Sequence, residues 1–217
     1  MVATVRRSSG WPWAVVAFLC VAVGGYAVFL VATGFTYVPT NVLANSFPSA
    51  LGLQLHITAS ALAILLGPWQ FVRRLRATRP AVHRWMGRTY VLACTLGGVA
   101  GGSIALFSAA GPIAGSGFFA LAIGWLFTTL MGWRAALRRD YVTHQRWMIR
   151  SFALTLAAVT LRIYLPLGIM LNHGDFYAPY RAIAWLCWVP NLLVAEVWLL
   201  RRARDGSQFP PARTPSV

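Results

Sequence analysis

The stretch "WAVVAFLCVAVGGYAVFLV" at residues 13–31 contains no charged residue. A helix that crosses the hydrocarbon core of a bilayer needs about 20 apolar residues in succession, and this run meets that requirement. Arg6 and Arg7 precede it, as basic residues precede the apolar part of a signal peptide. The run is too long for a typical signal peptide, however, and no small-residue cleavage site follows it. We therefore interpret residues 12–34 as a membrane span.

The composition of the whole chain agrees with a membrane protein. Of the 217 residues, 58% are apolar and only 11% are charged, whereas a soluble domain of this length carries far more charge. The net charge of +15 comes from arginines that lie in short clusters between apolar runs. Because no polar segment is long enough to form a soluble basic domain, this pattern argues against nucleic-acid binding.

Five further windows are long and apolar enough to span a bilayer. The sequence thus predicts an all-α integral membrane bundle of six transmembrane helices that occupies residues 1–200. A basic, proline-rich tail at residues 201–217 follows, and we expect it to be disordered. The five further windows lie at residues 50–72, 85–109, 117–137, 146–169 and 180–200.

The arginines predict the orientation of the bundle. All of them except Arg162 and Arg181 lie in the N-terminal segment, in the second and fourth connections with the helix starts that follow, or in the C-terminal tail. Cytoplasmic loops of membrane proteins are enriched in Lys and Arg. Both termini are therefore expected in the cytoplasm, as an even number of spans requires.

Two of the basic connections end in similar motifs, "HRWMGRTY" at 83–90 and "HQRWMIRSF" at 144–152. Each motif joins an outward-to-inward span to an inward-to-outward span. Spans 2–3 and 4–5 are therefore expected to form a parallel repeat about an axis along the membrane normal. The Arg-Trp start of each motif is also what an ordinary interfacial anchor looks like.

The second arginine of each motif, Arg88 or Arg150, lies further inside its span. Charged groups at such depths need partners, and Glu196 is the only acid within a predicted span. We expect Glu196 to pair with Arg150 or Arg88. The remaining positive charge predicts an anionic ligand at the cytoplasmic end, such as a propionate, a phosphate or a lipid headgroup, with Gln70 as a further donor.

A second polar group is expected near the outer side of the membrane. Arg162 lies about 7 Å and His56 about 8 Å from the midplane of their spans. No acid lies at the depth of Arg162, so helix carbonyls or the loop group around His173 would have to satisfy it. An unpaired deep arginine favours a functional outer-side site formed by His56, Arg162 and His173.

Two backbone features accompany these charges. Four glycines in span 3 form two overlapping small-xxx-small pairs, which indicate close helix packing or, less often, room for a flat cofactor. Pro190–Asn191 interrupts span 6 and predicts a kink that frees a carbonyl inside the bundle. The glycines are Gly97, Gly98, Gly101 and Gly102.

The chain resembles a family of uncharacterised bacterial multi-span membrane proteins, a domain of unknown function. The resemblance covers most of residues 50–165. It rests on His56, "GPWQFVRRLR" at 67–76, "HRWMGRTY" at 83–90 and "HQRWMIRSFALTLAAVTLR" at 144–162.

The chain is also similar, more weakly, to the six-helix, ascorbate-reducible b-type cytochromes, in which histidines on the four central helices bind two haems. This resemblance implies that His83 and His144 ligate one haem b iron, with arginines at the propionates. His56 matches one outer ligand, but span 4 has no histidine, so the second site is incomplete unless His173 substitutes. His83 and His144 lie about 20 Å from the midplane, outside the hydrocarbon.

Three functions follow from these residues. The first is a redox protein that holds one b-type haem or a quinone at the arginine-rich cytoplasmic side. The second is a transporter or lipid-handling protein that binds an anionic lipid headgroup. The third is an intramembrane enzyme acting on a lipid or isoprenoid, with His56 as a base and Arg162 steadying an anion. A structural membrane protein without a small ligand is a further alternative.

Overall fold

A computed structural model describes residues 11–40, 42 and 50–204. The secondary structure of these residues is entirely helical. The predicted N-terminal segment up to residue 10 and residues 205–217 lie outside the described part. The helix α10 (Val189–Arg204) continues through Arg201–Arg204, so the first four residues of the predicted disordered tail are helical.

Each predicted window corresponds to one helix or to a pair of consecutive helices. The first three are α1 (Trp11–Ala32), α3 (Ala50–Gln70) and α5 (Pro80–Ala105), with the short helix α4 (Arg73–Thr78) in the basic connection between α3 and α5. The fourth is α6 (Pro112–Leu137). The fifth window divides into α7 (Tyr141–Thr155) and α8 (Ala157–Leu171), and the sixth into α9 (Tyr177–Leu186) and α10.

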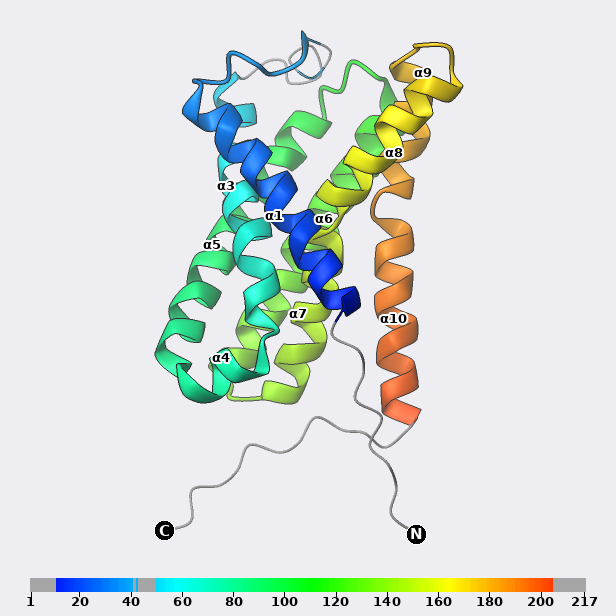
Figure 1. Ribbon diagram of the computed structural model, residues 1–217. Coiled ribbons are helices and arrows are strands. Elements are labelled where there is room, and N and C mark those ends of the chain that lie inside the picture. Colours follow the sequence, from blue (N-terminus) through cyan, green and yellow to red (C-terminus); the bar gives the residue numbers. More distant parts are fainter. Residues whose placement is uncertain (1–10, 41, 43–49, 205–217) are drawn as a thin grey trace, which may run out of the picture.

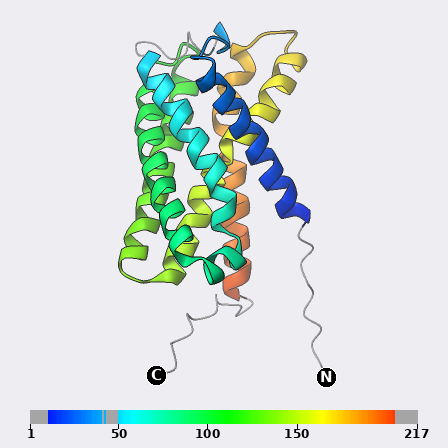
Figure 2. The same ribbon diagram turned by 60° about the vertical axis from the view of Figure 1, so that its left-hand side comes forward.

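Four helices form the centre of the bundle. Both α5 and α7 pack against α3 and against α6, so α5 and α7 stand opposite each other across this group. Outside it, α1 slants across α3 and reaches α8, while α9 and α10 cover α6 and α7 (Figures 1 and 2). Figure 1 places α4 and the turn between α6 and α7 at the same, lower end of the bundle. The two motif-bearing connections are therefore neighbours in space.

The glycines of α5 form its contacts with both neighbours. A Cβ on Gly97 would lie 3.1 Å from Ser60 Oγ of α3, and one on Gly101 would lie 2.7 Å from His56 Nδ1 of the same helix. The other pair, Gly98 and Gly102, meets Leu126 and Ala122 of α6. Since residues four apart share a helix face, each small-xxx-small pair supports one close helix contact. The glycines thus allow the close helix packing that the sequence predicted.

The break between α9 and α10 lies at Cys187–Trp188, two residues before Pro190, near the position that the sequence predicted. Proline has no backbone N–H and its ring clashes with the carbonyl four residues earlier, so a helix does not continue through it unchanged. The backbone oxygen of Cys187, which lies in this break, accepts a hydrogen bond from Asn191 Nδ2 at 3.0 Å and another from Thr160 Oγ1 of α8. Asn191 of α10 and Thr160 of α8 thus meet at one carbonyl in the break between α9 and α10.

By length and apolar composition, five segments of the described residues are suited to cross a membrane. They are Trp11–Ala32, Ala50–Gln70, Pro112–Leu137, Tyr141–Leu171 and Tyr177–Arg204. The remaining predicted span corresponds to α5, which has 26 residues and carries His83, Arg84 and Arg88 in its first three turns. The protein is a helical membrane bundle.

Candidate functional site

The two repeated histidines, His83 and His144, lie on the faces of α5 and α7 that turn toward the interior of the bundle. His83 precedes Tyr90 by seven residues, and His144 precedes Ser151 by the same interval. Seven residues are about two turns of an α-helix, so each histidine lies below its partner on one face. Tyr90 and Ser151 are fully buried in the bundle. The repeat therefore places a histidine and a hydroxyl group on each of two opposed helices.

The hydroxyl groups form a buried network in the middle of the bundle. The Tyr90 hydroxyl lies 2.8 Å from Thr155 Oγ1 and 3.1 Å from Ser151 Oγ. Ser151 Oγ in turn lies 2.7 Å from Thr129 Oγ1 of α6. Trp125 Nε1 donates to Thr155 Oγ1 at 2.9 Å. Buried polar groups are stable when each has a partner, and this hydroxyl network links α5, α6 and α7.

His144 is held in one orientation by the backbone of α6. Its Nδ1 lies 2.8 Å from the carbonyl oxygen of Gly132. A carbonyl only accepts, so Nδ1 carries the proton, and in the neutral ring Nε2 is left as an acceptor. This backbone contact is also the kind that orients metal-binding histidines.

His83 and Gln70 each retain a buried polar atom without a partner among the described residues: Nδ1 of His83 and Nε2 of Gln70. Gln70 ends α3 and is only 8% exposed. Its Oε1 lies 3.4 Å from the position of a Cβ on Gly87, which is one turn above His83 on α5. A buried donor without a partner is destabilising, so its presence points to a ligand or water.

Arg76 of α4 completes this end of the bundle. Its Nη1 donates to the backbone oxygen of Gln70 at 3.3 Å. Its charge acts on both His83 and His144, which places the four side chains in one neighbourhood. We call Gln70, Arg76, His83 and His144 the inner cluster.

The environment of His83 keeps its imidazole neutral. Burial is the main cause that lowers the pKa of His83, to about 4, and the positive charges of Arg76, His144 and Arg84 add to this effect. His83 lies near the start of α5, before the apolar part of the helix. A neutral imidazole is the form that binds a metal.

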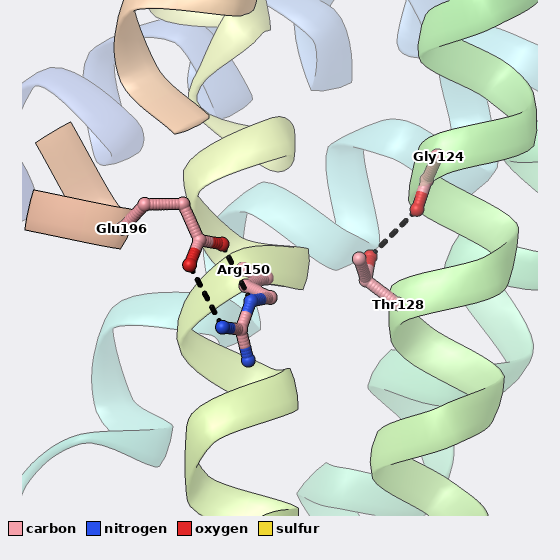
Figure 3. A network of polar contacts seen from close by, with 4 residues as sticks. All are labelled: Gly124, Thr128, Arg150 and Glu196. Atoms are coloured by element: carbon pink, nitrogen blue, oxygen red, sulfur yellow. Dashed lines mark hydrogen bonds and ion pairs between the residues drawn. The ribbon is translucent and has the colours of Figure 1, made fainter. Parts of the chain in front are cut away.

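Arg150 and Glu196 form a two-pronged ion pair between α7 and α10 (Figure 3). Arg150 Nε lies 2.6 Å from Glu196 Oε1, and Nη2 lies 2.8 Å from Oε2. The guanidinium also stacks on Trp147, 4.8 Å from the ring centre. The predicted pairing of Glu196 with Arg150 is thus present. In Figure 3 the hydrogen bond from Thr128 to the Gly124 carbonyl on α6 stands apart from this pair.

Arg88 does not join Glu196. It lies exposed on α5, with its guanidinium 5.2 Å from the ring centre of Trp85. Of the two arginines that the sequence offered to Glu196, the structure thus pairs Arg150 and leaves Arg88 apart. The reason is that α10, which carries Glu196, packs against α7 and not against α5.

The predicted outer-side residues divide into two groups. His56 Nδ1 lies 2.8 Å from the carbonyl oxygen of Gly97, and the charge of Arg162 acts on this ring. Arg162 Nη1 donates to the carbonyl of Ala158 in its own helix at 2.9 Å. His173 is exposed in the turn after α8, about 16 Å along the chain axis from Arg162. It therefore does not complete a site with the other two.

Sequence reasoning missed Arg76 and the buried hydroxyl network. Tyr90 and Ser151 were within the quoted motifs, and their common distance of seven residues from the repeated histidines was the signal that could have found them. Arg76 was one of several arginines in a basic connection. Only its place on α4, next to the end of α3, distinguishes it.

A family described as "Predicted membrane protein (DUF2306)" matches residues 53–199. The chain belongs to this family. The match confirms the first resemblance given by the repeated motifs. No curated protein and no solved structure matches the chain.

The segment that matches the family contains the inner cluster, the hydroxyl network, the Arg150–Glu196 pair and both His56 and Arg162. Within the described residues, no group of three or more His, Cys, Asp and Glu side chains is placed to hold a metal ion. A metal site at the inner cluster would therefore rely on His83 and His144 alone. Two histidines suffice only where further ligands come with the metal, as a porphyrin supplies them.

Proposed function

We propose that this member of the DUF2306 family is a membrane redox protein that holds one b-type haem between His83 and His144. The observation that supports the proposal most directly is the placement of these histidines near the starts of α5 and α7. These two helices are opposed in the bundle, and their starts lie at the same end of it. His144 presents Nε2 because its Nδ1 is engaged with Gly132. His83 has a buried Nδ1 without a partner in the described residues.

The other members of the inner cluster suit the propionates of a haem. Arg76 is half-buried and pairs with no carboxylate in the described part of the chain. Gln70 Nε2 is a buried donor that lacks an acceptor among the described residues. Charge-assisted hydrogen bonds from arginine to carboxylates are among the stronger polar contacts in proteins, so these two side chains would orient the group by its acidic edge.

When bound, haem supplies reversible one-electron transfer. The residues of this chain would set the conditions for it. The low pKa of His83 keeps its ring neutral and able to bind iron. Arg76 offsets the negative charge of the propionates. The buried hydroxyl network, two turns further into the bundle, fixes the separation of α5 and α7 and hence of the two histidines.

The same proposal includes six spans with both termini in the cytoplasm. The five apolar segments together with α5 give six crossings. The arginine-rich α4 and the turn between α6 and α7 lie at one end, which the positive-inside rule assigns to the cytoplasm. The inner cluster would then face the cytoplasmic surface and its reductants.

A reduced-minus-oxidised absorption spectrum tests the haem proposal. Protein purified in detergent from cells supplied with a haem precursor should show the Soret and α-band shift of a low-spin b-type haem on addition of dithionite. His83→Ala and His144→Ala should each abolish that spectrum, while His56→Ala should retain it. A monodisperse wild-type protein whose spectrum does not change with dithionite would contradict the proposal.

A second candidate is the binding of an anionic phosphate or lipid headgroup at the inner cluster. The observation that favours it is the positive charge of Arg76 beside the unpaired Gln70 donor. Phosphatidylglycerol should then raise the unfolding temperature of the haem-free protein, and Arg76→Gln should remove that gain. An equal response of the wild type and Arg76→Gln would rule out this candidate without bearing on haem.

A further inference from the structure

Both copies of the repeated motif contain an arginine stacked on a tryptophan, but only the copy in α7 joins that arginine to an anion. In each copy the second arginine stacks on the tryptophan three residues before it: Arg150 on Trp147 with 4.8 Å to the ring centre, and Arg88 on Trp85 with 5.2 Å. Arg150 also donates to both carboxylate oxygens of Glu196 (Figure 3). The α7 copy therefore shows that an anion with two oxygens fits this stacked arginine.

Arg88 has no such partner. Among the described residues it makes no hydrogen bond and no ion pair. The acids in that part of the chain are engaged elsewhere: Asp140 caps α7, Asp175 accepts from the first backbone amide of α9, and Glu196 binds Arg150. The guanidinium of Arg88 thus keeps its planar set of N–H donors available to a ligand.

The side of α5 that carries Arg88 is open to lipid. α5 packs against α3, α4 and α6, whereas α10 supplies the acid that meets the corresponding arginine of α7. Trp85 is 66% exposed, and Arg84 and Arg88 are exposed beside it. Arg84 precedes Arg88 by four residues, so their Cβ atoms lie about 5–6 Å apart and their like charges repel. An anion that contacts both side chains removes this repulsion.

The depth of Arg88 suits the phosphate of a phospholipid. Arg88 lies about 14 Å from the midplane of its span. The hydrocarbon core ends about 15 Å from the midplane, and the phosphates lie beyond that boundary. A long arginine side chain can extend to the interface from this depth. Trp85 lies about one turn nearer the end of the bundle, at the level where indole rings are enriched in membrane proteins.

We propose that Arg88, together with Arg84 and Trp85, binds the phosphate of an anionic phospholipid on the lipid-facing side of α5. The two unesterified phosphate oxygens accept from the guanidinium of Arg88, as the carboxylate of Glu196 accepts from Arg150. The second positive charge, on Arg84, favours a lipid with a net negative charge over a zwitterionic one. This site lies on an exposed side of α5, so it does not depend on what the inner cluster binds.

Native mass spectrometry of the full-length protein, purified in detergent and stripped of lipid, tests the site. Phosphatidylglycerol should bind the wild type about tenfold more tightly than Arg88→Gln, because the variant loses a charged, two-pronged donor. Trp85→Leu should also weaken binding, since it removes the ring that supports the guanidinium. Arg74→Gln, which removes the same charge from an exposed position of α4, is the matched control and should bind as the wild type does.

Two further probes identify the source of the phosphate. Phosphatidylcholine should bind the wild type more weakly than phosphatidylglycerol, because it has no net charge. Inorganic phosphate should neither bind as tightly nor displace phosphatidylglycerol, because it lacks the acyl chains that hold a lipid against the exposed side of α5. Equal binding of phosphatidylcholine would contradict the need for an anionic lipid, and equal binding of inorganic phosphate would assign the site to a free anion.

Three results with the variants would also overturn the proposal: equal affinity of Arg88→Gln and the wild type, an equal loss in Arg74→Gln and Arg88→Gln, or a loss in Arg76→Gln alone. The last result would place the lipid at the inner cluster. Thermal unfolding without lipid shows whether each variant folds, and Arg88→Gln should unfold at the wild-type temperature. If it does not fold, Arg88→Lys takes its place. This variant keeps the charge but not the planar donors, and it must weaken binding for the proposal to stand.

Discussion

Tyr90 of α5 and Ser151 of α7 share a hydrogen bond of 3.1 Å across the bundle, although 61 residues separate them in the chain. Their helices are not adjacent in the central group, because α3 and α6 each lie between α5 and α7. The bond thus joins opposed helices directly. The bond lies about two helical turns from His83 and His144. It therefore helps to set the separation of α5 and α7 at the inner cluster.

Tyr90→Phe should destabilise the protein by about 1–2 kcal/mol, because Ser151 and Thr155 each lose a hydrogen-bond partner in a buried site. Unfolding by denaturant in detergent micelles measures the change. Tyr141→Phe is the control, since Tyr141 is 57% exposed and its hydroxyl makes no hydrogen bond within the described residues. Equal stabilities of the two variants would mean that the network contributes nothing to folding.

Substitution of Arg150 and substitution of Arg88 should change the free energy of unfolding by different amounts, although each is the second arginine of its copy of the repeated motif. Arg150→Gln should cost about 1–2 kcal/mol, because it breaks a two-pronged, partly exposed ion pair with Glu196. Arg88→Gln should change stability by less than about 0.5 kcal/mol, since Arg88 is exposed. A double-mutant cycle with Glu196→Gln should show coupling to Arg150 and none to Arg88. Coupling to Arg88 would contradict the assigned pairing.

Gly101→Ala should destabilise the protein by about 1–3 kcal/mol, because its Cβ would lie 2.7 Å from His56 Nδ1 and would push the ring off the Gly97 carbonyl. Gly25→Ala in α1 is the matched control. A Cβ there meets nothing within 4 Å, so alanine should leave stability unchanged or raise it through its higher helix propensity. Thermal unfolding of both variants checks the contrast, and a stable Gly101→Ala would show that His56 moves freely.

The free energy of unfolding of the haem-free protein should decrease as the pH is lowered, over a range set by the pKa of His83. Its pKa in the folded protein is about 4, below the ordinary value of 6.5. Between these values the unfolded chain binds a proton that the folded protein does not, so stability is full above pH 6.5 and decreases as the pH falls toward 4. His83→Gln should flatten the dependence in this window. An unchanged slope in that variant would assign the effect to other groups.

Much of the fold followed from local properties of the chain. The uncharged run at 13–31 predicted α1, and five further apolar windows predicted the remaining long helices. Pro190 predicted the break before α10 because a proline removes one backbone N–H from its own helix, and this effect does not depend on what packs around that helix. The glycine pairs predicted close contacts of α5, although the sequence did not say which helix met which pair.

The candidate site was harder to predict from the sequence, because a motif does not show which side of a helix faces which neighbour. In α5 the second arginine follows its histidine by five residues, and in α7 by six. One extra residue rotates a side chain about 100° around a helix, so Arg88 and Arg150 leave their helices on different sides. The interval of seven residues is the same in both copies, which is why Tyr90 and Ser151 meet.

The sequence by itself determined that this is a helical membrane protein, where its apolar helices lie, and that its basic connections repeat a motif. These properties depend on the transfer of apolar side chains into lipid and on proline and arginine acting locally. Only the tertiary structure decided the partners: Glu196 with Arg150, Arg76 with the end of α3, and His56 with Gly97. Partner choice depends on which helices adjoin and how each is rotated about its axis, and both are set by packing across the whole bundle.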